Sequence, residues 1–115
     1  MSEGCLFCRI VAGEIPATEV YRTPTLVAIR DIGPQAPTHV LVIPRRHIPS
    51  LDAAKPADGE LLAKLMLTAA EVARRAGIVD GGYRVVNNCG AGAGQSVPHV
   101  HLHVLGGRHL SWPPG

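Results

Sequence analysis

The chain has 115 residues, of which 46% are hydrophobic and 17% charged, so it has enough apolar surface for one folded core, and overall disorder is excluded. Lys and Arg residues are scattered and the formal net charge is only +2, so no nucleic-acid-binding surface is expected. The longest apolar runs, such as residues 40–43, are too short to cross a bilayer, and the N-terminus has no signal-peptide pattern. We therefore expect a single cytoplasmic domain over residues 1–115, with no membrane or nucleic-acid partner.

The first half of the chain predicts only short elements. A short helix is expected over residues 5–12, ending at Gly13. Residues 32–37 are expected to form a loop, because two prolines and a glycine disfavour any regular element there. Three segments have the composition of strands, namely 19–22, 26–30 and 39–43.

The one long helix is predicted over residues 58–76. Asp58 is expected to cap its N-terminus, and Gly77 can adopt the left-handed conformation that ends many helices. Apolar residues recur at spacings of three and four and give this helix one apolar face. They are Leu61, Leu62, Leu65, Met66, Ala69, Val72, Ala73 and Ala76.

The last third of the chain predicts two more strands. They span residues 83–88 and 99–105, and the glycine-rich segment 90–94 lies between them. The tail, residues 112–115, is expected to be irregular. Because strands outnumber long helices and most connections are short, the sequence predicts an α+β domain, with a mainly antiparallel sheet that carries a helix on one face.

Three histidines alternate with apolar residues in the last predicted strand. Side chains of a strand alternate between its two faces, so we expect His99, His101 and His103 on one face, about 7 Å apart along the strand. A single strand histidine is usually structural, but three on one face indicate a chemical role. Three imidazoles can bind a transition metal, or one can attack phosphorus while its neighbours orient it and handle protons.

The segment before the histidines favours phosphoryl chemistry. The glycines of residues 90–94 let backbone amides approach an anion closely, and Gln95 and Ser96 add polar groups. A glycine-rich loop alone is often a flexible turn, but this one runs directly into the histidine segment. The sequence therefore predicts a phosphate cradle beside a nucleophile.

Residues 95–105 closely resemble the signature of the histidine triad (HIT) superfamily, in which histidines alternate with hydrophobic residues. The ending 106–108, with the tail 112–115, is similar to the Hint branch, the purine nucleoside phosphoramidases. The resemblance implies a five-stranded antiparallel sheet with one long and one short helix, pairing into a two-fold homodimer. Four further segments resemble the family's N-terminal region and central strands, namely 6–10, 14–17, 31–39 and 42–48.

The resemblance also implies a role for each catalytic residue. The middle histidine of the motif, His101, is the implied nucleophile. His103 is implied to contact the phosphate and to assist protonation of the leaving group, and His99 to orient the nucleophile through the intervening backbone. Ser96 lies where the Hint branch has a hydroxyl near the leaving group. His39, on the neighbouring predicted strand, is expected to face these histidines.

Substrate contacts are implied in the same way. Asp31 matches a carboxylate that accepts both ribose hydroxyls, and Asn88 matches an asparagine that contacts the phosphate. Phosphate contacts are implied for a further segment, Gly94, Gln95, Ser96 and Val97. Four apolar residues lie where the family forms a slot for the base, Ile10, Ile29, Ile32 and Leu41. Ordinary core packing explains these apolar residues equally well from the sequence.

Three positions depart from the family pattern, namely Asn87, Cys89 and Pro98. Asn87 stands where an apolar residue is common, and we expect it to touch no catalytic group. It is therefore predicted to affect specificity and loop rigidity more than the type of reaction.

Two cysteines form a second motif, Cys5-x-x-Cys8. In a chain without an export signal, this spacing favours metal or redox chemistry over a structural disulfide. Many bacterial HIT proteins look similar at both cysteines, and in them two thiolates and two histidines bind zinc. The resemblance therefore implies a closed, structural zinc site formed by Cys5, Cys8, His47 and His99.

The implied reaction is hydrolysis or transfer on nucleoside 5′-phosphoramidates, through a covalent intermediate on His101, with no cofactor required for catalysis. The implied substrate is a purine nucleoside monophosphate that carries an amine or another leaving group. Three alternatives remain. A dinucleoside polyphosphate hydrolase would use the same histidines, a metal-dependent hydrolase would use them as ligands, and a non-catalytic nucleotide-binding regulator would keep the same pocket.

Overall fold

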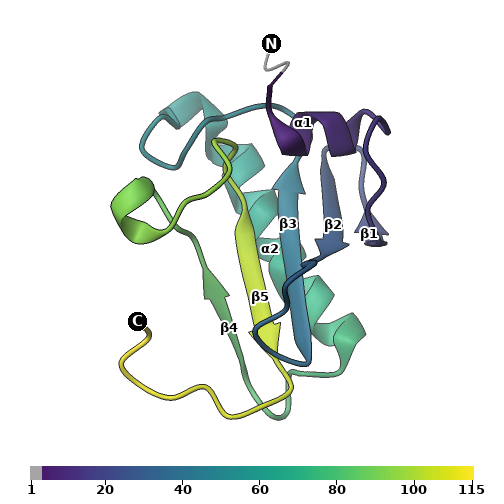
Figure 1. The fold of residues 1–115 in the computed structure, drawn as a ribbon, viewed down its shortest axis with the longest axis vertical. Helices are drawn as coiled ribbons and strands as arrows, with labels where there is room; N and C mark the ends of the chain where they lie inside the picture. Colours follow the sequence, from purple (N-terminus) through teal and green to yellow (C-terminus); the bar gives the residue numbers. More distant parts are fainter. Residues whose placement is uncertain (1–3) are drawn as a thin grey trace.

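Residues 4–115 are described by the structure, which is a computed structural model. A five-stranded antiparallel sheet lies at its centre, in the order β1-β2-β3-β5-β4 (Figure 1). The strands are β1 (Glu19–Arg22), β2 (Leu26–Arg30), β3 (Thr38–Pro44), β4 (Tyr83–Val86) and β5 (Leu102–Gly106). With one long and one short helix, this sheet confirms the predicted α+β class.

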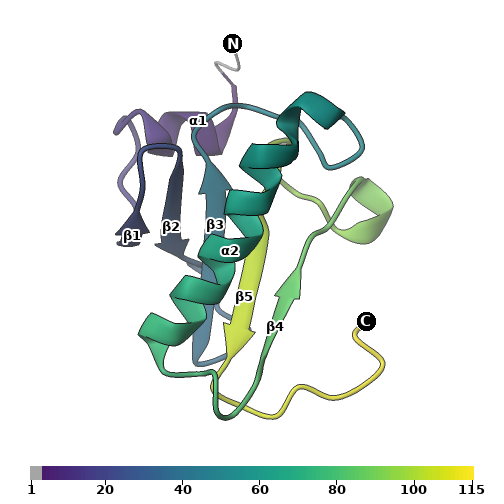
Figure 2. The same ribbon diagram turned by 180° about the vertical axis from the view of Figure 1, so that it is seen from behind.

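Helix α2 (Gly59–Ala76) covers one face of the sheet (Figure 2). It packs mainly on β3 and β5. Helix α1 (Leu6–Val11) lies at one end of the sheet, near the C-terminal end of β3. The apolar side chains between α2 and the sheet form the larger core cluster, which comprises Leu26, Ala28, Val40, Val42, Leu65, Ala69, Val72, Ala73, Ile78, Leu102 and Val104.

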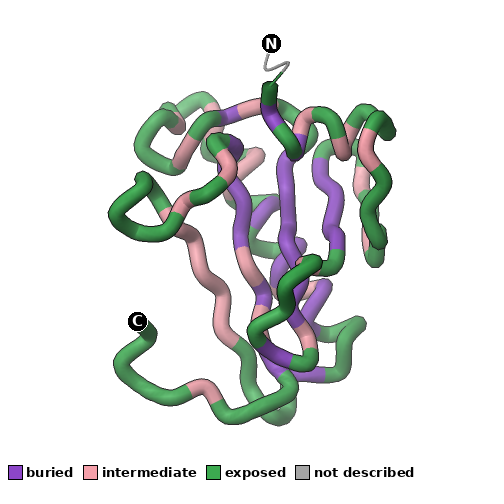
Figure 3. The backbone as a smooth tube through the Cα atoms, viewed as in Figure 1, coloured by how far each residue is buried: buried purple, intermediate pink, exposed green. Residues whose placement is uncertain are grey.

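The opposite face of the sheet holds a second, smaller core. Strand side chains alternate between faces, so β2 and β3 are buried on both sides, as the buried stretches in Figure 3 show. This second cluster combines residues of α1 with the outer faces of β2 and β3, namely Cys5, Phe7, Val27, Ile29, Leu41 and Ile43. The histidines of β3 and β5 lie on this face, away from α2.

The last two strands are shorter than predicted at the ends that face the glycine-rich loop. β4 ends at Val86 and β5 begins at Leu102, so His99 and His101 precede the strand instead of lying within it. The backbone N–H groups just before β5 are bonded elsewhere. The backbone N–H of His99 donates to Val97 O (2.8 Å) and that of Val100 donates to Ile48 O (2.6 Å), so these groups are not available to the sheet.

Helix α2 begins differently from the prediction and ends as predicted. Gly77 has a φ of +73° and its N–H bonds to the last turn of the helix, as expected. Asp58 occupies the N-cap position but makes no capping bond to the helix. Its carboxylate instead accepts from the Lys55 N–H and pairs with Arg46.

The apolar face of α2 is narrower than predicted. Met66 was expected on it but is 57% exposed, and Leu67 beside it is 69% exposed. These two side chains point away from the sheet, so the helix carries apolar surface on its outer side as well. Within residues 4–115, no helix combines the length and apolar composition that a membrane crossing requires.

Candidate active site

His101 and His103 form the centre of the site, on the sheet face opposite α2. Their ring centroids are 5.1 Å apart, closer than the spacing of about 7 Å predicted along an extended strand. Phe7 of α1 packs edge-on against His101, with ring centroids 4.9 Å apart and planes at 85°. Helix α1 therefore helps to hold the ring of His101 and excludes water from one side of it.

The hydrogen bonds of His101 determine which of its nitrogens carries the proton. Nδ1 lies 2.8 Å from the carbonyl oxygen of His99, and a carbonyl can only accept, so Nδ1 carries the proton. The lone pair of the neutral ring is then on Nε2. His101 is only 4% exposed, and this burial lowers its pKa below the ordinary 6.5. At neutral pH the ring is therefore neutral and nucleophilic.

His103 is fixed by a second histidine. Its Nδ1 lies 2.8 Å from Nε2 of His39, on the adjacent strand β3, so His39 faces the site as expected. Nδ1 of His39 accepts the backbone N–H of Gln35 (3.0 Å), which leaves the His39 proton on Nε2 and the His103 proton on Nε2 as well. Burial, with repulsion from the His101 and His39 rings, lowers the pKa of His103 to about 4.

Asn87 contacts the main chain of His101, which the sequence did not predict. Its Nδ2 donates to the backbone oxygen of His101 at 3.0 Å, so Asn87 does touch a proposed catalytic residue, through its main chain and not through its imidazole. Its Oδ1 is buried and has no hydrogen-bond partner among the described residues. The indication of this contact in the sequence is a polar side chain at a position where an apolar one is common.

The glycine-rich loop is held in shape by Gln95. The Gln95 amide accepts from the Gly90 N–H (2.8 Å) and donates to the carbonyls of Pro49 (2.8 Å) and Val97 (3.0 Å). Because these bonds occupy the side chain, it supports the loop and is not available to a phosphate. In the described part of the chain, the N–H groups of Ser96 and Val97 donate to no protein acceptor, and Ser96 is exposed.

Gly90 and Gly94 have the backbone conformations that this loop requires. Their φ angles are +90° and +88°, in a region that other residues rarely adopt. Between them lies a single 3-10 turn, η2 (Ala91–Ala93). Asn88, predicted to contact phosphate, lies half-buried between the end of β4 and this loop.

Asp31 lies at the opposite end of β3 from the cysteines, close to His39. One carboxylate oxygen accepts from the Gly33 N–H (2.8 Å), and the other lies 3.5 Å from Nε2 of His39. The carboxylate thus caps the loop and remains partly exposed. Of the four residues predicted to form the base slot, Ile29 and Leu41 are buried in the smaller core and Ile10 packs on it. Ile32 is not with them, because its side chain is fully exposed (103%).

The four predicted metal ligands converge at the end of β3 nearest α1. The sulfur of Cys5 lies 3.3 Å from Nδ1 of His99, and that of Cys8 lies 3.4 Å from Nδ1 of His47 and 3.5 Å from Nδ1 of His99. The two imidazole nitrogens are 3.2 Å apart. All four ligand atoms are therefore near one another, as a metal site requires.

These distances fit a tetrahedral ion. Bond lengths of about 2.3 Å to sulfur and about 2.1 Å to nitrogen place tetrahedral ligand atoms about 3.4 to 3.8 Å apart, close to the observed 3.2–3.5 Å. His99 also has the correct tautomer, because its Nε2 donates to Pro44 O (2.7 Å), which leaves a lone pair on Nδ1. The donor set of two sulfurs and two nitrogens can hold a zinc-like ion.

A metal centre built from the three histidines of the motif is not supported. Nδ1 of His99 faces the cysteines, and Nδ1 of His101 is occupied by the His99 carbonyl. Among residues 4–115, the groups that can hold a metal combine His99 with Cys5, Cys8 and His47, and His103 with Asp31 and His39. The three imidazoles therefore do not form one cluster of potential metal ligands.

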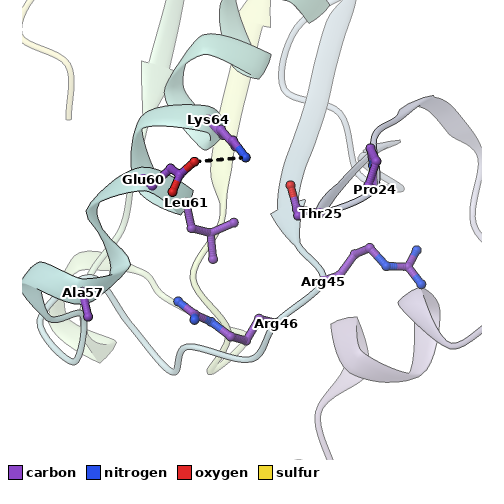
Figure 4. Close-up of a pocket in the computed structure, with 8 residues that line it drawn as sticks. All are labelled: Pro24, Thr25, Arg45, Arg46, Ala57, Glu60, Leu61 and Lys64. Carbon is purple, nitrogen blue, oxygen red and sulfur yellow. Dashed lines mark ion pairs between the residues drawn. The ribbon is translucent and has the colours of Figure 1, made fainter.

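A separate cavity of about 380 Å³ lies between α2 and the ends of β2 and β3 (Figure 4). It is lined by basic side chains, but Lys64 pairs with Glu60 (3.6 Å), and Arg46 pairs with Asp58. None of the site residues described above lines it. Two of its three basic side chains are thus in ion pairs, and the cavity lies apart from the histidines.

Comparison with known proteins identifies similar chains. The model of the HIT domain family matches residues 12–110. An uncharacterized HIT-like protein of Synechocystis is 51% identical over all 115 residues, which is the full length of both chains. A HIT family hydrolase from Legionella pneumophila is 50% identical, with a TM-score of 0.95 over 97% of this chain and 100% of that one. A histidine triad nucleotide-binding protein from Candida albicans is 30% identical, with a TM-score of 0.81 over 96% and 83%.

Proposed function

Because the chain belongs to the HIT domain family, we propose that it hydrolyses purine nucleoside 5′-phosphoramidates through a covalent nucleotidyl intermediate on His101. The observation that carries this proposal is the tautomer of His101, whose Nδ1–H donates to His99 O and leaves Nε2 as a buried, neutral nucleophile. Two proteins of similar structure, a HIT family hydrolase and a histidine triad nucleotide-binding protein, support the same interpretation.

The proposed reaction has two steps. In the first, Nε2 of His101 forms a bond to the α-phosphorus while the phosphorus–nitrogen bond breaks, and the amine leaves after it accepts a proton. The imidazole becomes positively charged, and its Nδ1–H bond to the His99 carbonyl stabilises that charge. In the second step, water attacks phosphorus, which releases the nucleoside monophosphate and restores neutral His101.

Other residues would bind the phosphate and protonate the leaving group. The Nε2–H of His103 is a donor for a phosphoryl oxygen or for the leaving group. The backbone N–H groups of Ser96 and Val97 can donate to the phosphate, and the exposed Ser96 hydroxyl can pass a proton to the amine. Asp31 is proposed to accept the ribose hydroxyls, with the base lying on the apolar surface of Ile10 and its neighbours.

The proposed metal is zinc, held by Cys5, Cys8, His47 and His99, and its role is structural. Its bonds would connect the N-terminal segment to the residue that precedes the nucleophile. No step of the proposed reaction uses it, because all four ligand positions come from the protein.

The test of the proposed function is a panel of substrates. Adenosine and guanosine 5′-phosphoramidates should be turned over with a higher kcat/KM than diadenosine polyphosphates. The reverse order would favour the related polyphosphate hydrolase activity. Nucleotide binding without turnover of any member would show that the chain is a binding protein and not a hydrolase.

The rate should depend on pH in a manner set by His101. Only the neutral ring attacks phosphorus, and burial lowers its pKa from 6.5. The acid limb of the kcat/KM profile should therefore lie below pH 6.5, with a constant rate above it until another group titrates. Steady-state kinetics of adenosine 5′-phosphoramidate from pH 4.5 to 8 measure this. An acid limb at or above pH 6.5 would contradict the assignment.

We also propose that two copies pair as a two-fold dimer. The outer side of α2 carries the exposed Met66 and Leu67, and β4 is an edge strand of the sheet. Sedimentation at micromolar concentration should give twice the chain mass of 12.1 kDa, and Leu67→Glu should shift the protein toward the monomer. A monomeric wild-type protein would contradict the proposal.

A further inference from the structure

The end of β5 lies beside the loop that connects β2 to β3 (Figure 1). Arg108, two residues beyond β5, donates to the carbonyl oxygen of Gln35 from both Nε (3.0 Å) and Nη2 (2.9 Å). Gly107 permits this approach. It has a φ of +91°, and a Cβ at this position would lie 2.9 Å from Cβ of Pro37. The motif Gly106-Gly107-Arg108 therefore fastens this exposed loop to the sheet.

The loop has a chemical connection to the site through Gln35. The hydrogen bond between His39 and His103 can run in either direction, because each neutral imidazole has one donor and one acceptor nitrogen. The backbone N–H of Gln35 removes this ambiguity, since it can only donate to Nδ1 of His39. The nearest carboxylate, Asp31, lies 3.5 Å from the other nitrogen of His39, a long distance for a strong hydrogen bond.

We propose that Arg108 is a positioning residue, which holds Gln35 in place and thereby keeps the proton of His103 on Nε2. The inference rests on the function proposed above, in which Nε2–H of His103 donates to the phosphoryl group or to the leaving group. The other tautomer would present a lone pair to an anionic substrate and would donate to His39 instead. The order of contacts is Arg108 to Gln35 O, Gln35 N–H to His39, and His39 Nε2–H to His103.

Histidine tautomers can be observed directly, without substrate, by ¹⁵N NMR of protein labelled at the imidazole nitrogens. In the wild type, His39 and His103 should both show a protonated Nε2 and an unprotonated Nδ1. In Arg108→Ala both rings should show averaged tautomers. The kcat for adenosine 5′-phosphoramidate should fall about tenfold, in line with the loss of a residue that orients a functional histidine, and KM should change less. Arg108→Lys, which keeps one donor group, should restore part of the wild-type tautomer pattern and part of the wild-type kcat.

The matched control is Arg84→Ala. Arg84 donates to the carbonyls of Leu110 and Ser111, so its loss loosens the same tail without touching Gln35. Its tautomers and kcat should resemble those of the wild type. Unchanged tautomers in Arg108→Ala, or an equal change in Arg84→Ala, would overturn the proposal. If the wild type fails to turn over the substrate, the proposed function is wrong, while the NMR comparison still tests the role of Arg108.

Discussion

Replacing His101 with Ala should lower turnover of a nucleoside 5′-phosphoramidate by about a thousandfold or more and leave nucleotide binding largely intact. The nucleophile is removed, and in catalytic units of this kind the loss of one member costs several powers of ten. The proposed binding groups, Asp31 and the backbone of residues 94–97, remain. Initial rates measure the first effect, and calorimetric titration with a nucleoside monophosphate measures the second.

The matched control for this variant is His109→Ala, since His109 is an exposed histidine in the tail and should be replaceable without loss of rate. Rapid-quench mass spectrometry of the wild-type protein should detect a nucleotidyl adduct on His101 during turnover. If His101→Ala kept a tenth of the wild-type rate, the covalent mechanism would be wrong. If the variant lost binding as well as rate, the ring would be required for the shape of the pocket and the assignment would not be supported.

Removing the metal should have its largest effect on stability. Protein purified without chelators should contain about one zinc ion per chain, and Cys5→Ser should lose the ion. Because the proposed ligand bonds would connect the start of α1 to the segment before β5, their loss should lower the midpoint of thermal denaturation by about 10 °C or more. Elemental analysis and calorimetry measure the two quantities.

Cys89→Ser is the control, because Cys89 is exposed and lies outside the ligand cluster. It should keep both the metal content and the denaturation temperature of the wild type. In Cys5→Ser, the single-turnover rate measured below the denaturation temperature should fall less than the stability does. Wild-type protein that contains no metal and is as stable as Cys5→Ser would contradict the structural role.

Patterns within short stretches of sequence were sufficient for much of the fold. Spacings of three and four residues predicted α2, and Gly77 predicted its end, because both depend on contacts within one helix. The strand boundaries beside the glycine-rich loop were wrong. The N–H of Val100 bonds to Ile48, a partner remote in sequence, and no pattern within residues 99–105 reveals such a partner.

At helix α2, Asp58 and Met66 likewise depend on contacts outside the helix. A residue at an N-cap position can bond elsewhere when a neighbouring segment offers better partners, as Arg46 and Lys55 do here. Whether an apolar helix residue is buried depends on where the sheet lies, and that is a property of the whole fold. Neither outcome is encoded in the helix pattern itself.

For the site, the sequence by itself determined the chemical groups: three alternating histidines, a glycine-rich loop before them, and the cysteines Cys5 and Cys8. The family resemblance implied a ligand set and a role for each histidine, but only the tertiary structure decided the tautomers, because they depend on the hydrogen-bond partners of each ring. The carbonyl of Pro44 leaves the lone pair of His99 on Nδ1, which faces the cysteines, whereas Gln35, bonded to Arg108, sets the tautomer of His39 and through it that of His103. For His99 and His103 the partners that set the proton, Pro44 and His39, are tens of residues away, and they meet only when the chain has folded.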